Sequence, residues 1–168
     1  MRKILCFFIC ALMLIFCSCK KAEPSDIKGA FEADAVVKFS RPFGNIDTVG
    51  MEVSGVFRSG QGQFTITSPD ELATLSYKWV RGVEISLDSL ECRTEVSYLP
   101  KESFIQTLYK VLCHVTVNGE FKGKPGEFWE FEGCTEGISY RVLTDKEGYI
   151  RNIFVEELNF TAEISYKE

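Results

Sequence analysis

Apolar and polar side chains alternate along most of this 168-residue chain. The alternation is cleanest in the last segment, residues 158–166, where every second position is apolar. A period of two predicts strands with one face in a core and one in solvent, as antiparallel sheets have. The same pattern recurs in five earlier segments: 31–39, 49–57, 64–66, 75–79 and 83–87.

Turn-forming residues separate the predicted strands. Residues 58–62 (Arg-Ser-Gly-Gln-Gly) separate two of them, and residues 145–148 (Asp-Lys-Glu-Gly) place glycine where a hairpin needs a positive φ. Residues 68–71 (Ser-Pro-Asp-Glu) match a capping box with proline in the first turn. This match predicts one helical turn at 69–73.

One segment, residues 100–115, follows a helical period instead. Its apolar side chains fall within an arc of roughly 120° on a helix; they are Phe104, Ile105, Leu108, Val111, Leu112 and Val115. Gln106, Lys110 and Cys113 are predicted to point away from this stripe. A wide apolar stripe needs a broad apolar surface to cover. We therefore predict a mainly β (α+β) domain, a single curved antiparallel sheet (half-barrel) with one amphipathic helix packed on its concave face.

The start of the chain has another pattern. Arg2 and Lys3 precede an uncharged apolar stretch at 4–16, which is typical of a secretory signal and too short to span a bilayer as a helix. Residues 16–19 (Phe-Cys-Ser-Cys) resemble the lipobox of bacterial lipoproteins, in which the last cysteine is lipidated and becomes the first mature residue. The resemblance implies a diacylglyceryl group on Cys19. A plain secretory signal cut nearby is the alternative.

Lipidation would divide the chain into a signal peptide (1–18), a lipidated cysteine with a polar tether (19–27) and one domain (28–168). Acyl chains would hold the protein on the extracytoplasmic side of the cell membrane without spanning it. Lys20 and Lys21 would lie at the headgroups, where each cation gains on the order of 1 kcal/mol from anionic lipid.

Charge and cysteine content narrow the function. The formal net charge of −5 argues against a nucleic-acid partner, which requires a basic face. The predicted domain keeps three cysteines, Cys92, Cys113 and Cys134, so it can form at most one internal bridge. Buried or unpaired thiols are the favoured interpretation.

Catalytic patterns are missing from the sequence. The single histidine, His114, follows Cys113 directly, and adjacent helical residues point about 100° apart, so the two cannot pair. Glu130 and Glu132 would share a strand face, a geometry that suits a divalent ion, but a solvated pair is the favoured interpretation. We expect a non-enzymatic protein without a metal or cofactor, in which His114 has a structural role.

Three stretches carry a resemblance to a known family: SPDELATLSYKW at 68–79, LPKESFIQTLYKVL at 99–112 and DKEGYIRNIFV at 145–155. With the opening strand at 31–39 and the closing strand at 158–166, they resemble the lipoprotein-carrier (LolA/LolB-like) half-barrel in clostridial lipoproteins. The resemblance implies a bacterial envelope protein that holds lipids or acyl chains.

Two functions remain as hypotheses. In the first, the domain binds a lipid, an acyl chain or a lipidated partner between helix and sheet. The candidate lining residues are Phe104, Leu108, Leu112, Trp79 and Phe128. In the second, the core is filled and the domain is a structural or protein-interaction module of the envelope. The space between helix and sheet distinguishes them.

Overall fold

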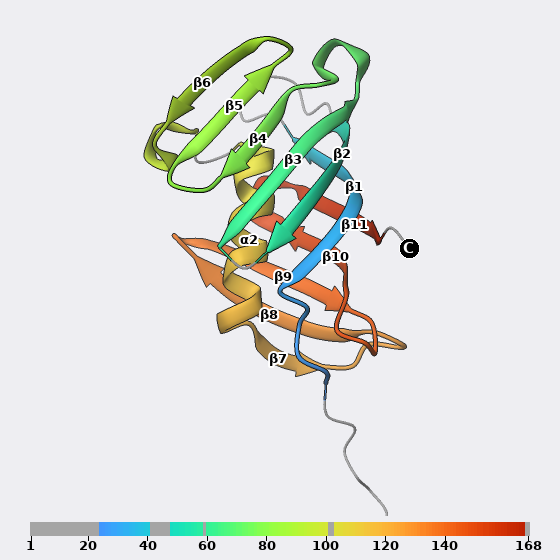
Figure 1. Cartoon of the computed structure of the whole chain (residues 1–168). Coiled ribbons are helices and arrows are strands. Elements are labelled where there is room, and N and C mark those ends of the chain that lie inside the picture. Colours follow the sequence, from blue (N-terminus) through green and yellow to red (C-terminus); the bar gives the residue numbers. More distant parts are fainter. Residues whose placement is uncertain (1–23, 41–47, 59, 101–102, 167–168) are drawn as a thin grey trace, which may run out of the picture.

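Figure 1 shows the computed structural model, which describes residues 24–40, 48–58, 60–100 and 103–166. The predicted signal peptide and the three predicted membrane-attachment residues, Cys19, Lys20 and Lys21, lie outside the described residues. Within the described ranges, no helix is long and apolar enough to cross a membrane.

The described part of the chain folds into one sheet of eleven antiparallel strands. The strands are β1 (Ala30–Ser40), β2 (Thr48–Arg58), β3 (Gln61–Ser68), β4 (Ser76–Trp79), β5 (Val83–Leu87), β6 (Leu90–Thr94), β7 (Glu120–Gly123), β8 (Trp129–Thr135), β9 (Ile138–Thr144), β10 (Ile150–Val155) and β11 (Phe160–Tyr166). Their order is β6-β5-β4-β3-β2-β1-β11-β10-β9-β8-β7. The first strand thus pairs with the last, and the two edges are β6 and β7.

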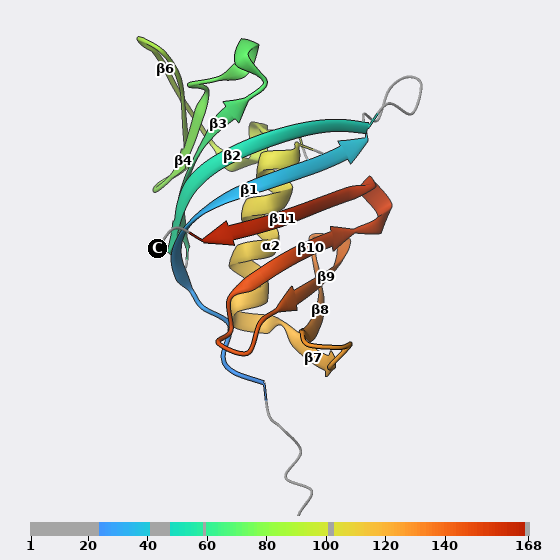
Figure 2. The ribbon, with the colours of Figure 1, turned by 90° about the vertical axis from the view of Figure 1, so that its right-hand side faces the viewer.

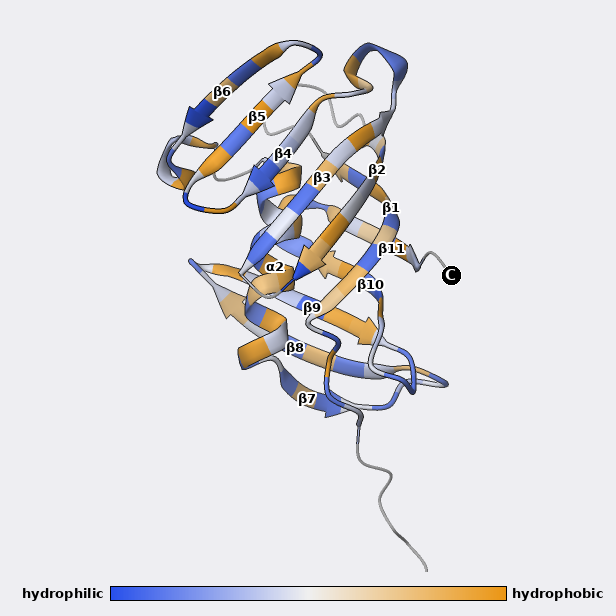
Figure 3. Cartoon of the chain, viewed as in Figure 1, coloured by the Kyte–Doolittle hydropathy of each residue, from blue (hydrophilic) through white to orange (hydrophobic). Residues whose placement is uncertain are grey.

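The predicted alternation is confirmed. Hydrophilic and hydrophobic residues alternate along β1, β2 and β3 (Figure 3), and their apolar set joins one buried cluster to which every strand except the edges β6 and β7 contributes. In β1, for example, Ala33, Ala35 and Val37 are buried while the residues between them face solvent. The final strand starts at Phe160 and not at Leu158, because Glu156–Leu158 form a 3-10 turn.

A single α-helix lies in the described part, α2 (Phe104–Asn118), and it connects the two edge strands β6 and β7. A helix that connects opposite edges must cross the sheet. Its side chains meet strands on both sides of β1: Tyr109 stacks on Trp79 of β4, and the ring of His114 meets that of Tyr140 of β9 edge-on. Figure 2 shows the curved sheet with α2 running across it.

Two local features differ from what the helix and turn patterns suggest. Gln106 was expected opposite the apolar stripe, yet it is buried, with 2 % of its surface exposed. Its amide, in the orientation that satisfies both polar atoms, donates to the Pro100 carbonyl (3.1 Å) and accepts from Lys110 Nζ (2.8 Å). The capping box is also absent, because the 3-10 turn Asp70–Leu72 has Pro69 as its N-cap and no side-chain cap.

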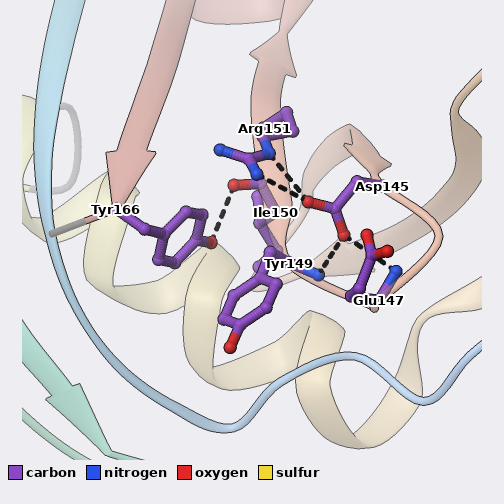
Figure 4. A network of polar contacts seen from close by, with 6 residues as sticks. All are labelled: Asp145, Glu147, Tyr149, Ile150, Arg151 and Tyr166. Carbon is purple, nitrogen blue, oxygen red and sulfur yellow. Dashed lines mark hydrogen bonds and ion pairs between the residues drawn. The ribbon is translucent and has the colours of Figure 1, made fainter. Parts of the chain in front are cut away.

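The predicted turn at 145–148 joins β9 to β10 and is organised by one carboxylate (Figure 4). Asp145 Oδ1 accepts from the backbone N–H groups of Glu147 (3.0 Å) and Tyr149 (2.9 Å). Its other oxygen, Oδ2, lies 2.9 Å from Arg151 Nε and 2.8 Å from Nη2. Gly148 has the expected positive φ of 87°.

The chain that precedes β1 docks on this turn. Lys28 donates its backbone N–H to the Gly148 carbonyl (2.9 Å), and the Ser25 hydroxyl donates to the Lys146 carbonyl (2.5 Å). Ile27 packs against the core. The predicted tether, residues 19–27, is therefore in contact with the domain from Ser25 onward.

Candidate functional site

An aromatic group joins α2 to the strands β2, β3 and β4. The rings of Tyr109 and Trp79 are stacked with centroids 4.4 Å apart, and Phe57 and Phe64 meet this pair edge-on. Such ring pairs add roughly 0.5–1.5 kcal/mol each beyond the area they bury. The group therefore holds the helix against this half of the sheet.

Two hairpin turns hold the helix on its opposite flanks. At the β2–β3 turn, the Gly60 carbonyl accepts a hydrogen bond of 3.0 Å from the Tyr109 hydroxyl. At the β8–β9 turn, Glu136 Oε2 lies 2.6 Å from Lys110 Nζ. Tyr109 and Lys110 are adjacent in the helix and point about 100° apart, so the two turns approach different sides of it.

The structure brings four of the five predicted lining residues together in the buried cluster: Phe104, Leu108, Leu112 and Trp79. Leu108 and Leu112 are each 1 % exposed. A cavity large enough for a lipid would leave accessible surface on the side chains that line it. These four side chains instead fill the space between helix and sheet. Phe128 lies outside the cluster and is 37 % exposed.

Four polar atoms in the described interior have no hydrogen-bond partner. They are the indole N–H groups of Trp79 and Trp129 and the hydroxyls of Thr107 and Thr144. An unpaired buried donor costs about 1–3 kcal/mol. Trp79 and Thr107 lie on the two sides of the helix–sheet interface, so they are the polar groups available to a ligand there.

Two pockets lined by described residues lie on the outer face of the sheet, away from α2. One, of about 360 Å³, is lined mainly by side chains at outward positions of β8–β10 and the turn after β10: Glu132, Ser139, Arg141, Phe154, Glu156 and Glu157. The other, of about 290 Å³, lies over β2–β4, with Arg58, Lys78 and Gln63 among its lining residues. Charged and polar side chains line both pockets beside the apolar ones, which does not suit an acyl chain.

His114 has a structural environment. Its Nδ1 lies 2.7 Å from the Tyr140 hydroxyl, and the two rings meet edge-on. Burial raises the pKa of Tyr140 to about 12, so this phenol keeps its proton at neutral pH. Burial also raises the pKa of the Cys113 thiol, which makes it a poor nucleophile. Neither neighbour offers His114 a proton-transfer role.

The three cysteines of the domain are free. Cys92 and Cys134 are exposed and Cys113 is half-buried, so the expectation of buried or unpaired thiols in place of a bridge is confirmed. Glu130 and Glu132 share the outer face of β8, as predicted. Within the described ranges, no group of three or more His, Cys, Asp or Glu residues is placed to hold a metal ion.

Sequence reasoning missed the contacts that hold the helix. Tyr109 lies at the border of the apolar stripe, and nothing in the sequence links it to Gly60, 49 positions away. Glycine in a hairpin and glutamate at a turn are ordinary turn residues. Their role depends on the curvature that brings both turns back to the helix.

Comparison with known proteins finds that this chain is similar to solved structures alone. It matches no protein-family model and no curated protein sequence. Among solved structures it is similar to the LolA superfamily protein of Nitrosomonas europaea, at 7 % sequence identity and a TM-score of 0.39, over 83 % of this chain and 84 % of that one. The description of the fold therefore rests on its own strand order and packing.

Proposed function

We propose that this protein is a lipid-anchored, non-enzymatic protein of the extracytoplasmic membrane surface, whose half-barrel carries α2 on its concave face and works with a filled core as a protein-interaction module. The packing of the helix carries the proposal. Phe104, Leu108, Leu112 and Trp79 occupy the space that an apolar ligand would need. A ligand would have to displace them, at roughly 1.5–3 kcal/mol for each side chain exposed.

The anchor and the domain would lie close together. Cys19 precedes Ser25, the first docked residue, by six positions. An extended chain covers at most 3.3–3.6 Å per residue, so the β9–β10 turn would stay within about 20 Å of the lipid surface. The carboxylate network of Asp145 would then fix the direction in which the domain faces.

Membrane fractionation of the full chain in a bacterial host tests the anchor. We expect Cys19→Ala to move the protein from the membrane fraction to the soluble fraction and to abolish labelling by a radioactive fatty acid. Cys17→Ala, two positions earlier, is the matched control and should leave both unchanged. Unchanged partitioning of Cys19→Ala would contradict the anchor.

Acyl-chain binding after displacement of the helix is the second candidate. The unpaired indole N–H of Trp79 supports it, because a carboxylate or ester oxygen could accept from this group. Titration of the full chain in detergent with a fluorescent fatty acid separates the candidates. The filled core predicts no saturable binding, whether or not the helix contacts are weakened by Tyr109→Phe. Saturable binding that Tyr109→Phe strengthens would favour the second candidate.

A further inference from the structure

The edge strand β6 has the properties of a surface that pairs with another strand. It is outermost at its end of the sheet (Figure 1), and it pairs with β5 over five residues without a bulge. Leu90 is 72 % exposed, and its cross-strand partner Leu87 is also exposed. A regular, partly apolar edge without proline offers a row of backbone groups to an incoming strand.

Charges on the outer face of this edge form an alternating row. Lys78 of β4, Glu84 of β5 and Arg93 of β6 are cross-strand neighbours. Glu84 lies 3.6 Å from the lysine Nζ and 3.7 Å from an arginine Nη. Across β4, β5 and β6 the charges are positive, negative and positive, and Arg93 is the last because β6 is the edge strand. A strand that pairs with β6 should therefore place a negative side chain opposite Arg93.

β6 itself carries such a negative side chain, Glu91, two positions before Arg93. Glu91 has its side chain on the outer face, like Arg93, and forms no ion pair within the described ranges. If two copies of β6 lie antiparallel about a two-fold axis at Cys92, each Glu91 lies directly opposite the partner's Arg93. Opposite charges at directly facing positions stabilise an antiparallel pair. The edge is therefore complementary to itself.

We propose that two copies of this chain associate through β6, antiparallel and centred on Cys92, to form one continuous sheet. The register places Leu90 opposite the partner's Thr94 on the inner face and covers part of the exposed leucine. It places the two Cys92 residues opposite each other, where Cα atoms in an antiparallel pair lie about 4.5–5.5 Å apart, within reach of a disulfide. Such a two-fold contact is closed, so it stops at a dimer. The pairing does not rest on the proposed function.

Oxidative cross-linking of the full chain in detergent tests the register. With diamide as oxidant, two Cys92 thiols give their hydrogen atoms to its N=N bond, which becomes a hydrazine while one S–S bond forms. Cleavage after lysine releases residues 79–101, which contain Cys92 as their single cysteine. We expect the 79–101 homodimer to form in at least tenfold greater yield than the corresponding link through Cys134, the other exposed thiol of the domain. Equal yields would overturn the proposal.

Charge variants test the complementarity and guard against misfolding. Glu91→Arg and Arg93→Glu should each lower the yield of the 79–101 homodimer at least fivefold, since like charges then face each other. Mixing the two variants places two arginines opposite two glutamates and should restore the cross-link to within twofold of the unmodified chain. Glu120→Arg on the other edge, β7, should have no effect. Failure of the mixture to recover, or an equal loss with Glu120→Arg, would overturn the pairing.

Discussion

The two halves of the sheet, β2–β6 and β7–β11 on either side of β1, pack against α2 in the same way. Each turns a hairpin towards α2, and each lays an aromatic ring over a glycine on the neighbouring strand. In one half Phe64 covers Gly55, and in the other Tyr140 covers Gly133. Glycine inside a strand permits close approach and strong bending. The same kind of contact, an aromatic ring over a strand glycine, therefore supports the curvature around the helix in both halves.

The halves differ at their free edges. β7 has four residues and a register shift between Phe121 and Gly123, and its Lys122 and Glu120 pair with each other (2.9 Å). A short, bulged edge is protected against further pairing. β6 has an unbroken register, and its Glu91 forms no ion pair with the residues that the structure describes. The comparison indicates that the core imposes the same demands on both halves, whereas the edges are free to differ in what they bind.

The largest predicted effect tests these contacts between glycine and aromatic ring. Gly55→Ala places a Cβ 2.6 Å from the Gln63 carbonyl, which cannot move freely, and should lower the free energy of unfolding by about 2–3 kcal/mol. Gly133→Ala meets the Tyr140 hydroxyl and should cost about 1–3 kcal/mol. Urea unfolding followed by circular dichroism measures both.

Gly50→Ala is the matched control for the glycine variants, because no atom lies within 4 Å of its added Cβ and it belongs to the same strand as Gly55. An equal loss at all three positions would show that strand glycines matter through their propensity and not through the rings above them.

The next effect concerns the β9–β10 turn, residues 145–148, on which the chain before β1 docks. Asp145→Ala removes the acceptor of two backbone N–H groups and the partner of Arg151, and should lower the free energy of unfolding by about 1–2 kcal/mol. Proteolysis should also become faster at residues 25–28, which contact this turn. Unaltered cleavage there would mean that the turn does not hold the preceding chain.

A smaller effect compares the two contacts of the helix. Tyr109→Phe removes the hydrogen bond to Gly60, and Lys110→Met removes the pair with Glu136 together with the hydrogen bond to Gln106. Each should cost about 0.5–1.5 kcal/mol in urea unfolding. The two losses should add in the double variant, because the contacts lie on different flanks. A clear departure from additivity would indicate that the hairpins act as one unit.

The smallest effect is a pH dependence in the C-terminal half. Burial raises the pKa of Tyr140 from 10.0 to about 12, so the folded protein keeps a proton that the unfolded chain loses. Stability should therefore fall as the pH rises from about 10 to 12. Tyr140→Phe should reduce this slope. Tyr109 and Tyr166, whose pKa values burial also raises, should retain the remainder. An unchanged slope in Tyr140→Phe would contradict the assignment.

Periodicity predicted the helix and the strands β1–β5 and β11, because these depend on local alternation between core and solvent, but it did not single out β6–β10. It placed Phe104, Leu108, Leu112 and Trp79 correctly in one cluster. It gave no sign that Gln106 is buried, since this amide bonds to the Pro100 carbonyl, which lies outside the helix.

Sequence alone also could not show whether the space between helix and sheet is empty. That space depends on curvature, and the curvature depends on contacts between distant residues such as Gly133 and Tyr140, or Tyr109 and Gly60. The two charges of β6, Glu91 and Arg93, by contrast, lie only two positions apart in the sequence. Their complementarity can be recognised only once β6 is known to be an edge strand.

Native mass spectrometry of the full chain released from detergent tests the filled core most directly. The account predicts a mass equal to the chain with its covalent anchor, as a monomer or dimer, without further adducts. Leu108→Ala, which opens space next to α2, should differ only by the mass of the substitution. A lipid held non-covalently at one per chain, and lost in a Leu108→Trp variant, would contradict the filled core and identify the helix–sheet interior as a binding site.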